Sequence, residues 1–353
     1  GQAESTRRFA QAQIGNFQQR LEHLHRGGGG NRNTLSFAAD PRCLEPLVGR
    51  TVDGCAEEDE RDPRTGASAN AGEGQDSPWG SWIGGVIRSG SLDGRAGRPD
   101  LDFETDGISA GVDYRVNDDF AIGAGFGWGQ DEVQVGRNGS RIQGDARTLA
   151  MYASWHPGQR MFVDGVVGTQ DLSFDLRRYL TATGGFVGGQ RDGDQWFASV
   201  SAGSEIDRGN GMRLSPYVRY DLARAELDAY VETGHPIFAL AYAPMDVDTS
   251  VGTLGLRMDW RRDTSWGAIT PLLRLEYQQD LSGRTTAEMG YADLPGGPVY
   301  GVAASRFDRN RFVTGLGALL DTDGGWNWRL EYRGQFSSDG DDHGLQMNVQ
   351  KQF

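Results

Sequence analysis

The sequence lacks any long hydrophobic run, and this absence excludes the commonest way of crossing a membrane. Its longest apolar stretch, Ile237 to Met245, already contains Pro244, whereas a membrane-spanning helix needs about 20 apolar residues. With 37% hydrophobic residues and a mean hydropathy of -0.55, hydropathy alone indicates a soluble acidic protein. That test does not exclude a transmembrane β-barrel, because only every second residue of a barrel strand faces lipid.

Positive charge is also scarce. The 35 Lys and Arg residues are outnumbered by 49 Asp and Glu residues, which gives a net charge of -14. A nucleic-acid partner is therefore not expected, since binding one requires a basic surface. The acids gather in expected loops, for example at Asp339, Asp341 and Asp342. They favour solubility, and bridging to lipopolysaccharide through divalent ions is the alternative role.

Cysteine and histidine are too few for most metal sites. The two cysteines, Cys43 and Cys55, lie in one irregular acidic segment without histidines nearby, and their spacing matches no common zinc pattern. A disulfide is the favoured state in an oxidising compartment, ahead of two free thiols and of a metal site. His23 and His25 lack other ligand types at metal spacing. We therefore expect no metal and no cofactor.

Glycine, by contrast, is abundant, with 53 residues, and the chain from Trp79 onward reads as strands separated by turns. Many short strands with glycine-rich turns favour a sandwich or a barrel. About twelve strands are predicted, an even number that suits a bacterial barrel. They cover 79–90, 103–116, 119–135, 141–155, 160–175, 194–207, 212–228, 246–261, 266–281, 308–321, 325–337 and 343–353.

The connections between these strands alternate in length. The short ones are expected at 117–118, 156–159, 208–211, 262–264 and 322–324. Most of the others are longer, at 91–102, 176–193, 229–245 and 282–307. Outer-membrane barrels show this difference between periplasmic turns and external loops. Aromatic residues near the short turns or the chain ends suit a membrane interface: Trp79, Phe120, Trp155, Trp260, Trp266, Trp326, Trp328 and Phe353.

Charged residues in the best-defined strands keep to one face. In 254–260, for example, Leu254, Leu256 and Met258 alternate with Arg257 and Asp259. An arginine facing the middle of the bilayer costs about 2–4 kcal/mol, so the charged face is expected to line the lumen. The residues predicted to face the lumen are Arg213, Arg219, Arg257, Arg274, Glu276, Arg329, Glu331 and Arg333.

The chain ends in the pattern of a last barrel strand. Leu345, Met347, Val349, Lys351 and Phe353 form one file, and Gln and Asn residues form the other. A soluble strand can show the same alternation, so the ending gains weight from the similar hairpins before it. The predicted fold class is all-β, an antiparallel transmembrane β-barrel of about 12 strands over 79–353.

Residues 1–26 form a predicted α-helix, expected inside the pore of the barrel. Its narrow apolar stripe comprises Ala10, Ile14, Phe17, Leu21 and Leu24. From Ser5 to Arg26 the helix is about 33 Å long, close to the thickness of a bilayer core. Its arginines, at positions 7, 8, 20 and 26, are expected to meet lumen acids such as Glu276 or Glu331. A frayed tail or a coiled-coil segment is the alternative. Residues 27–78 form a Gly-rich, acidic linker or periplasmic insert.

An N-terminal helix followed by about twelve strands and a terminal phenylalanine resembles the translocator domain of type V autotransporters. The resemblance covers about 10–26 and 79–353. The stretch from Gln13 to Leu21 resembles the family's pore helix, which ends in an Asn-x-x-x-Arg-hydrophobic pattern, here Asn16, Arg20 and Leu21. The strand from Thr270 to Tyr277 is similar to the family's proline-containing strand with an inward glutamate. The terminal Phe353 resembles the signal read by the β-barrel assembly machinery.

The resemblance implies an integral protein of the Gram-negative outer membrane that anchors an N-terminal passenger and helps to export it to the cell surface. The implied pore-helix residues are Ile14, Asn16, Phe17, Arg20, Leu21 and Leu24. The implied partners are that passenger, the assembly machinery and outer-membrane lipid or lipopolysaccharide. No enzyme activity and no catalytic residue are expected.

Two features depart from the family pattern. Some self-cleaving members break the chain between two adjacent asparagines of the helix, whereas Gly15 precedes Asn16 here, so that cleavage is not expected. The insert at 31–76 is long for the family. The topology implied by the resemblance places this insert in the periplasm, where Cys43 and Cys55 are able to pair.

Two other outer-membrane functions also fit a barrel. A porin or channel shares the barrel and its polar lumen, but a helix in the lumen leaves little room for conduction. A barrel hydrolase of the omptin kind needs an Asp–His pair within hydrogen-bond reach, and His235 and His343 lie in expected external loops. An outer-membrane phospholipase is less favoured, because no His-x-Ser pattern is present.

Overall fold

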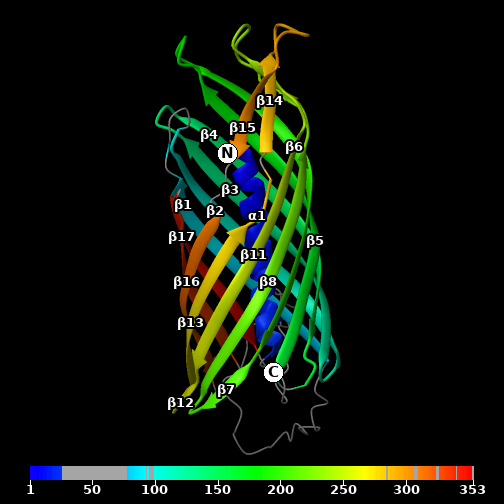
Figure 1. Ribbon diagram of the computed structural model, residues 1–353, viewed down its shortest axis with the longest axis vertical. Coiled ribbons are helices and arrows are strands. Elements are labelled where there is room, and N and C mark those ends of the chain that lie inside the picture. Colours follow the sequence, from blue (N-terminus) through cyan, green and yellow to red (C-terminus); the bar gives the residue numbers. More distant parts are fainter. Residues whose placement is uncertain are drawn as a thin grey trace, which may run out of the picture.

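The computed structural model describes residues 1–25, 78–92, 94, 99–158, 160–283, 285–305, 309–322, 326–338 and 340–351. The acidic linker, both cysteines, Arg26 and Phe353 lie outside the described residues. The predicted disulfide and the predicted assembly signal therefore stay predictions. The described chain consists of strands closed into a barrel and one helix inside it (Figure 1).

Twelve long antiparallel strands of the described chain form the barrel, which confirms the fold class predicted from sequence. Neighbours in the chain pair with each other, and the last strand pairs with the first, so no edge is left with unsatisfied backbone groups. The strands are β1 (Trp79–Leu92), β2 (Leu101–Asn117), β3 (Phe120–Val135), β4 (Ser140–Trp155), β5 (Met161–Tyr179), β6 (Phe186–Ser204), β8 (Met212–Leu227), β11 (Met245–Trp260), β13 (Gly267–Asp280), β16 (Asn310–Thr322), β17 (Trp326–Phe336) and β18 (Gly340–Lys351).

The two ends of the barrel differ in their connections. One end has short turns, together with the short strands β7 (Ile206–Gly209) and β12 (Arg262–Thr264). At the other end four strands form a separate sheet in the order β15-β14-β10-β9 (Figure 1). These are β9 (Tyr230–Val231), β10 (Leu240–Tyr242), β14 (Thr285–Tyr291) and β15 (Tyr300–Ser305). Short turns belong to the periplasmic side of such barrels, so the separate sheet lies at the external end.

The external connections contain more strand than the sequence predicted. The expected loop at 176–193 shrinks to 180–185, because β5 runs to Tyr179 and β6 begins at Phe186. The outward side chains of this region are polar, for example Asp175 and Asp192, so the apolar alternation that marks a membrane strand is missing. The expected loops 229–245 and 282–307 likewise hold the strands of the external sheet. Strand pairing therefore continues beyond the apolar part of the wall.

Exposure along the strands alternates with a period of two. On β4, Leu149 is 69% exposed whereas Tyr152 is 2% exposed. The exposed apolar side chains form a belt around the outside of the barrel, and they include Trp79, Phe126, Trp155, Leu254 and Trp328. An apolar surface of this extent requires lipid rather than water around it.

The helix α1 (Gln2–Leu24) runs along the inside of the barrel (Figure 1). Its N-terminal end lies at the external end, in contact with β15, and its C-terminal end lies among the short turns. In the described part of the chain, no helix has the length and apolar character needed to span a membrane. Although α1 is mostly polar, most of its side chains are buried by the barrel wall.

Candidate functional site

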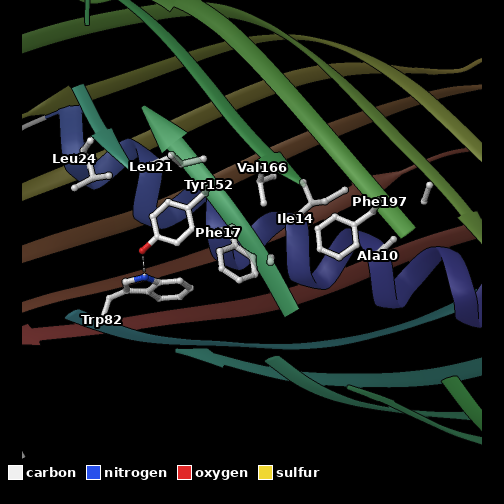
Figure 2. Packing of buried hydrophobic residues seen from close by; sticks show 12 residues of the cluster. Ala10, Ile14, Phe17, Leu21, Leu24, Trp82, Tyr152, Val166 and Phe197 are labelled. Carbon is white, nitrogen blue, oxygen red and sulfur yellow. Dashed lines mark hydrogen bonds between the residues drawn. The ribbon is translucent and has the colours of Figure 1, made fainter. Parts of the chain in front are cut away.

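The apolar stripe of α1 packs against one side of the barrel interior (Figure 2). Phe17 lies edge-on to Trp82 of β1, with ring centroids 5.2 Å apart. The indole Nε1 of Trp82 donates a hydrogen bond of 2.7 Å to the hydroxyl of Tyr152 on β4. The buried cluster includes Ala10, Ile14, Phe17, Leu21 and Leu24 of the helix, with Val166 and Phe197 from β5 and β6. The stripe recognised in the sequence is thus the contact face of the helix.

Glycines of β3 make room for this face of the helix. A Cβ atom at Gly125 would lie 2.9 Å from Phe17 Cε1, and one at Gly127 would lie 2.1 Å from Gln13 Oε1. Both distances are too short for van der Waals contact. The glycine run that the sequence contains in this strand therefore lets α1 approach the backbone of the wall closely.

Two arginines of α1 form bidentate ion pairs with the same side of the wall. Arg8 donates to Asp131 of β3 at 2.8 and 2.6 Å, and Arg20 donates to Asp113 of β2 at 2.7 and 2.9 Å. Between them, Asn16 Nδ2 donates to the Ser109 hydroxyl at 2.8 Å. The expected partners of the helix arginines, Glu276 and Glu331, are instead held by arginines of the wall.

Glu22 of α1 joins the helix to the wall through three ion pairs, and the sequence reasoning missed it. Its carboxylate forms ion pairs with Arg257 of β11 at 3.2 Å, Arg274 of β13 at 2.9 Å and Arg329 of β17 at 2.8 Å. Glu331 bridges the last two arginines from the wall side. The charged cluster joins the helix to the strands opposite the apolar contact. The sequence could have indicated it, because Glu22 directly follows the helix motif that ends in Arg20 and Leu21.

The other residues predicted to face the lumen extend this network. Arg213 contacts Glu205 at 3.0 Å, and Arg333 contacts Glu331 at 2.8 Å. Arg219 lies between Asp221 at 3.0 Å and Glu276 at 3.4 Å. The hydroxyl of Tyr217 also donates a hydrogen bond to Glu276. All eight side chains therefore take part in interior ion pairs, and three of them contact α1 directly through Glu22.

The C-terminal end of α1 is held by a second polar contact, at His25. Its Nε2 atom lies 2.8 Å from a carboxylate oxygen of Asp164 on β5, and its Nδ1 atom lies 3.5 Å from Glu205. The ring also packs on Phe162, with centroids 4.3 Å apart. The sequence reasoning considered His25 only as a metal ligand, so it missed this contact.

A polar groove remains between α1 and the strands opposite its apolar contact. The helix contributes Gln11, Gly15 and Gln18 to this groove, and the wall contributes charged side chains, among them Arg88, Arg219, Arg333 and Asp342. The groove ends at the cluster around Glu22 and Arg274. The helix thus occupies most of the lumen and leaves a polar groove beside it.

The described histidines outside the pore are engaged in local contacts. His235 Nδ1 accepts backbone N–H groups of Ile237 and Phe238 at 3.1 Å. His343 lies on the outer face and shares a hydrogen bond of 2.7 Å with the Tyr332 hydroxyl. Within the described ranges, no group of three or more His, Cys, Asp or Glu side chains is placed to hold a metal ion.

Comparisons with known proteins agree with this geometry. The family model described as "Autotransporter beta-domain" matches residues 81–333. Lipase 1 of Photorhabdus luminescens is 23% identical over 185 residues, which are 50% of this chain and 27% of that protein. Esterase EstA of Pseudomonas aeruginosa is 25% identical over 266 residues, which are 71% of this chain and 40% of that protein. The chain thus spans less than half the length of these two relatives.

A solved structure shows the same fold. The translocator domain of autotransporter NalP from Neisseria meningitidis superposes with a TM-score of 0.63 at 17% identity, covering 77% of this chain and 88% of that one. The match of the family model extends over most of the barrel, from β1 to β17. The chain therefore belongs to the autotransporter β-domain family and is an integral translocator barrel of the outer membrane.

Proposed function

We propose that this barrel anchors an N-terminal passenger at the cell surface, with α1 as the connection that stays in the pore. The direction of α1 supports this proposal most strongly. Its N-terminal end lies at the external mouth (Figure 1). His25, which follows its C-terminal end, contacts Asp164 near the start of β5, where the chain leaves a periplasmic turn. A segment joined ahead of α1 would therefore lie outside the cell once α1 is in place in the lumen.

We further propose that the barrel is the carrier and not the hydrolase. The names Lipase 1 and Esterase EstA describe proteins of which this chain matches 27% and 40%. An ester-hydrolysing activity would then belong to a passenger and not to the barrel. The use of the lumen charges to hold α1 supports this assignment, because those carboxylates and arginines are paired with each other.

The pore-helix role is proposed for Ile14, Asn16, Phe17, Arg20, Leu21 and Leu24, together with Glu22. In addition, we propose that the β-barrel assembly machinery inserts the chain and reads Phe353, that Cys43 and Cys55 form a disulfide in a periplasmic insert, and that outer-membrane lipid or lipopolysaccharide surrounds the belt. These proposals rest on the family membership and on the sequence pattern.

The carrier proposal is tested by fusing an epitope-tagged globular reporter ahead of Gly1, behind a secretion signal, in a Gram-negative host. We expect protease added to intact cells to remove the tag. The same reporter without residues 79–353 is the matched control and should stay protected. A tag that remains protected although the barrel shows heat-modifiable gel mobility would contradict the proposal.

A conductance measurement distinguishes the carrier from the alternative function, a porin. A porin with this lumen would conduct as an open pore in a planar bilayer, whereas a barrel filled by α1 should conduct only through the narrow groove beside the helix. Open-pore conductance of the intact chain would favour the porin over the carrier.

A further inference from the structure

The outer wall of β4 and β5 rises well above the apolar belt. The last strongly exposed apolar residues toward the external end are Leu149 on β4 and Val167 on β5, at 69% and 54% exposure. Beyond Leu149 the outward positions of β4 are polar up to Arg141. Eight residues of a strand tilted by about 40° rise about 20 Å. The tip of β4 therefore stands outside the hydrocarbon, where the outer leaflet presents its sugars.

Two arginines face each other at this tip. Arg141 of β4 and Arg177 of β5 are direct cross-strand partners, and both are exposed on the outer face. Like charges directly opposite each other destabilise a sheet. Among the described residues neither arginine forms an ion pair. The nearest acid along β5, Asp175, accepts a hydrogen bond of 2.8 Å from Gln190 instead.

The other outward arginines of the wall have carboxylates beside them. Arg147 lies directly opposite Asp171 in the β4–β5 register. Arg224 lies 3.4 Å from Glu226 and 3.6 Å from Asp246. In a chain with a net charge of -14, two arginines that face each other across the register without an ion pair present positive charge for an external anion.

An aromatic platform adjoins these arginines. The Arg177 guanidinium lies over the ring of Phe186, 3.7 Å from its centroid. Tyr179 packs edge-on to Phe186, with centroids 5.4 Å apart, and its backbone N–H donates to the Ser140 hydroxyl at 2.9 Å. The ring contact restricts the guanidinium, and Phe186 remains 37% exposed. An arginine held over a half-exposed ring suits a ligand that has both an anionic group and an apolar face.

We propose that Arg141, Arg177 and Phe186 bind a phosphorylated saccharide of the surrounding lipopolysaccharide. We call these three residues the outer arginine patch. Guanidinium groups bind phosphate through paired hydrogen bonds, and the exposed ring offers a surface for the apolar face of a sugar. The patch lies on the outside of the wall, not in the lumen, so it faces the neighbouring lipid layer. Its height selects phosphates of the core sugars over those at the hydrocarbon boundary.

The test uses the whole barrel, residues 1–353, refolded in detergent. Binding of purified lipopolysaccharide with a phosphorylated core is measured by native-gel mobility, beside the same lipopolysaccharide after removal of its core phosphates. We expect the phosphorylated form to bind at least tenfold more tightly. The double variant Arg141→Gln/Arg177→Gln should lose at least tenfold in affinity for the phosphorylated form and little for the dephosphorylated form.

The matched control is Arg147→Gln/Arg224→Gln, which removes two outward arginines that already have acids beside them. This control should bind as the unaltered barrel does. Heat-modifiable mobility shows whether each variant is folded, and if the glutamine pair fails to fold, Arg141→Lys/Arg177→Lys replaces it. The lysine pair keeps the charge without the paired hydrogen bonds, so it should show a smaller but measurable loss.

Three results would overturn the proposal. The first is equal affinity of the patch variant and the unaltered barrel. The second is equal affinity of the unaltered barrel for both forms of lipopolysaccharide. The third is competition by free inorganic phosphate or by heparin at the same phosphate or sulfate concentration, because either would show a general anion site without saccharide recognition.

Discussion

At the scale of single residues, Glu22 links parts of the barrel that are far apart in the sequence. One carboxylate of the helix contacts arginines from β11, β13 and β17. The apolar stripe of the same helix packs on β1, β4, β5 and β6. The helix is therefore held from two sides by different forces, since apolar burial acts on one side and charge pairing on the other.

Replacing Glu22 by Gln should destabilise the plugged barrel strongly. Removal of one partner from a buried ion pair costs about 3–5 kcal/mol, because the remaining charges are left without compensation. We expect a clear fall of the melting temperature in detergent. The control is Glu226→Gln, which removes an exposed carboxylate of the outer wall; exposed pairs contribute about 0–1 kcal/mol. Equal melting temperatures for both variants would contradict the role of Glu22.

His156 should make the stability of the barrel depend on pH. It lies in the periplasmic turn after β4, and burial, followed by the adjacent His25, lowers its pKa to about 4, below the ordinary value of about 6.5. Because the pKa of His156 is lower in the folded state, the unfolded state takes up the proton first as the pH falls. The contribution of neutral His156 to the free energy of unfolding is therefore complete above about pH 6.5 and is lost as the pH falls toward 4. We expect His156→Gln to reduce the fall of the melting temperature over this interval. Parallel melting curves for both proteins would count against it.

At the scale of elements, α1 is the part whose removal should change the barrel most. A helix with its side chains is about 10–12 Å wide, and α1 leaves only a polar groove beside it. Deleting residues 1–25 should therefore raise the single-channel conductance in planar bilayers severalfold and lower the melting temperature. Glu22→Gln with the helix retained is the comparison, and it should raise conductance less than the deletion. Unchanged conductance after the deletion would mean that α1 does not occupy the lumen.

The strands were predictable from the sequence because lipid imposes a strict alternation on them. Leu254, Leu256 and Met258 alternate with Arg257 and Asp259, and no other environment requires that pattern along so many strands. The apolar stripe of α1 was readable from its helical spacing for the same reason. The upper ends of β5 and β6 were not predictable, because outward residues such as Asp175 and Asp192 face water, and water imposes no such alternation.

The partners of individual side chains were not readable from the sequence. Arg20 pairs with Asp113 and not with Glu276 or Glu331, because the rotation of α1 in the barrel decides which wall each residue faces. That rotation depends on the glycines of β3 and on the register of all strands together. The contacts of Glu22 and His25 were not predicted, because a stripe of apolar residues says nothing about the opposite face of the helix.

At the scale of the whole molecule, the barrel differs between its two ends. The periplasmic end has short turns, whereas the external end carries polar strand extensions and a separate sheet of four strands. This difference suits a protein that is inserted from one side and presents its other side to the outside. The last strand closes the barrel by pairing with the first, and we propose that its end also directs insertion.

Deleting Phe353 should therefore impair insertion in cells far more than stability in vitro. Loss of one terminal residue should cost the barrel little stability, whereas it would remove the proposed recognition signal entirely. The measurement is the outer-membrane yield of the shortened chain beside its melting temperature in detergent. The replacement Phe353→Tyr keeps an aromatic end and should restore most of the yield. Equal yields with and without Phe353 would remove the assembly-signal argument.

The glycines of β3 have a consequence for how such a chain can change over time. Because Gly125 and Gly127 leave room for the side chains of Phe17 and Gln13 at the wall, the inner surface of the barrel is complementary in shape to this particular helix. A helix from a relative that has bulkier residues at the positions of Gln13 and Phe17 should not fit against this wall, even though the strand number is the same. Substitutions in the helix and in the wall are thus constrained to occur together. A carrier of this kind should therefore accept a new passenger more readily than a new pore helix.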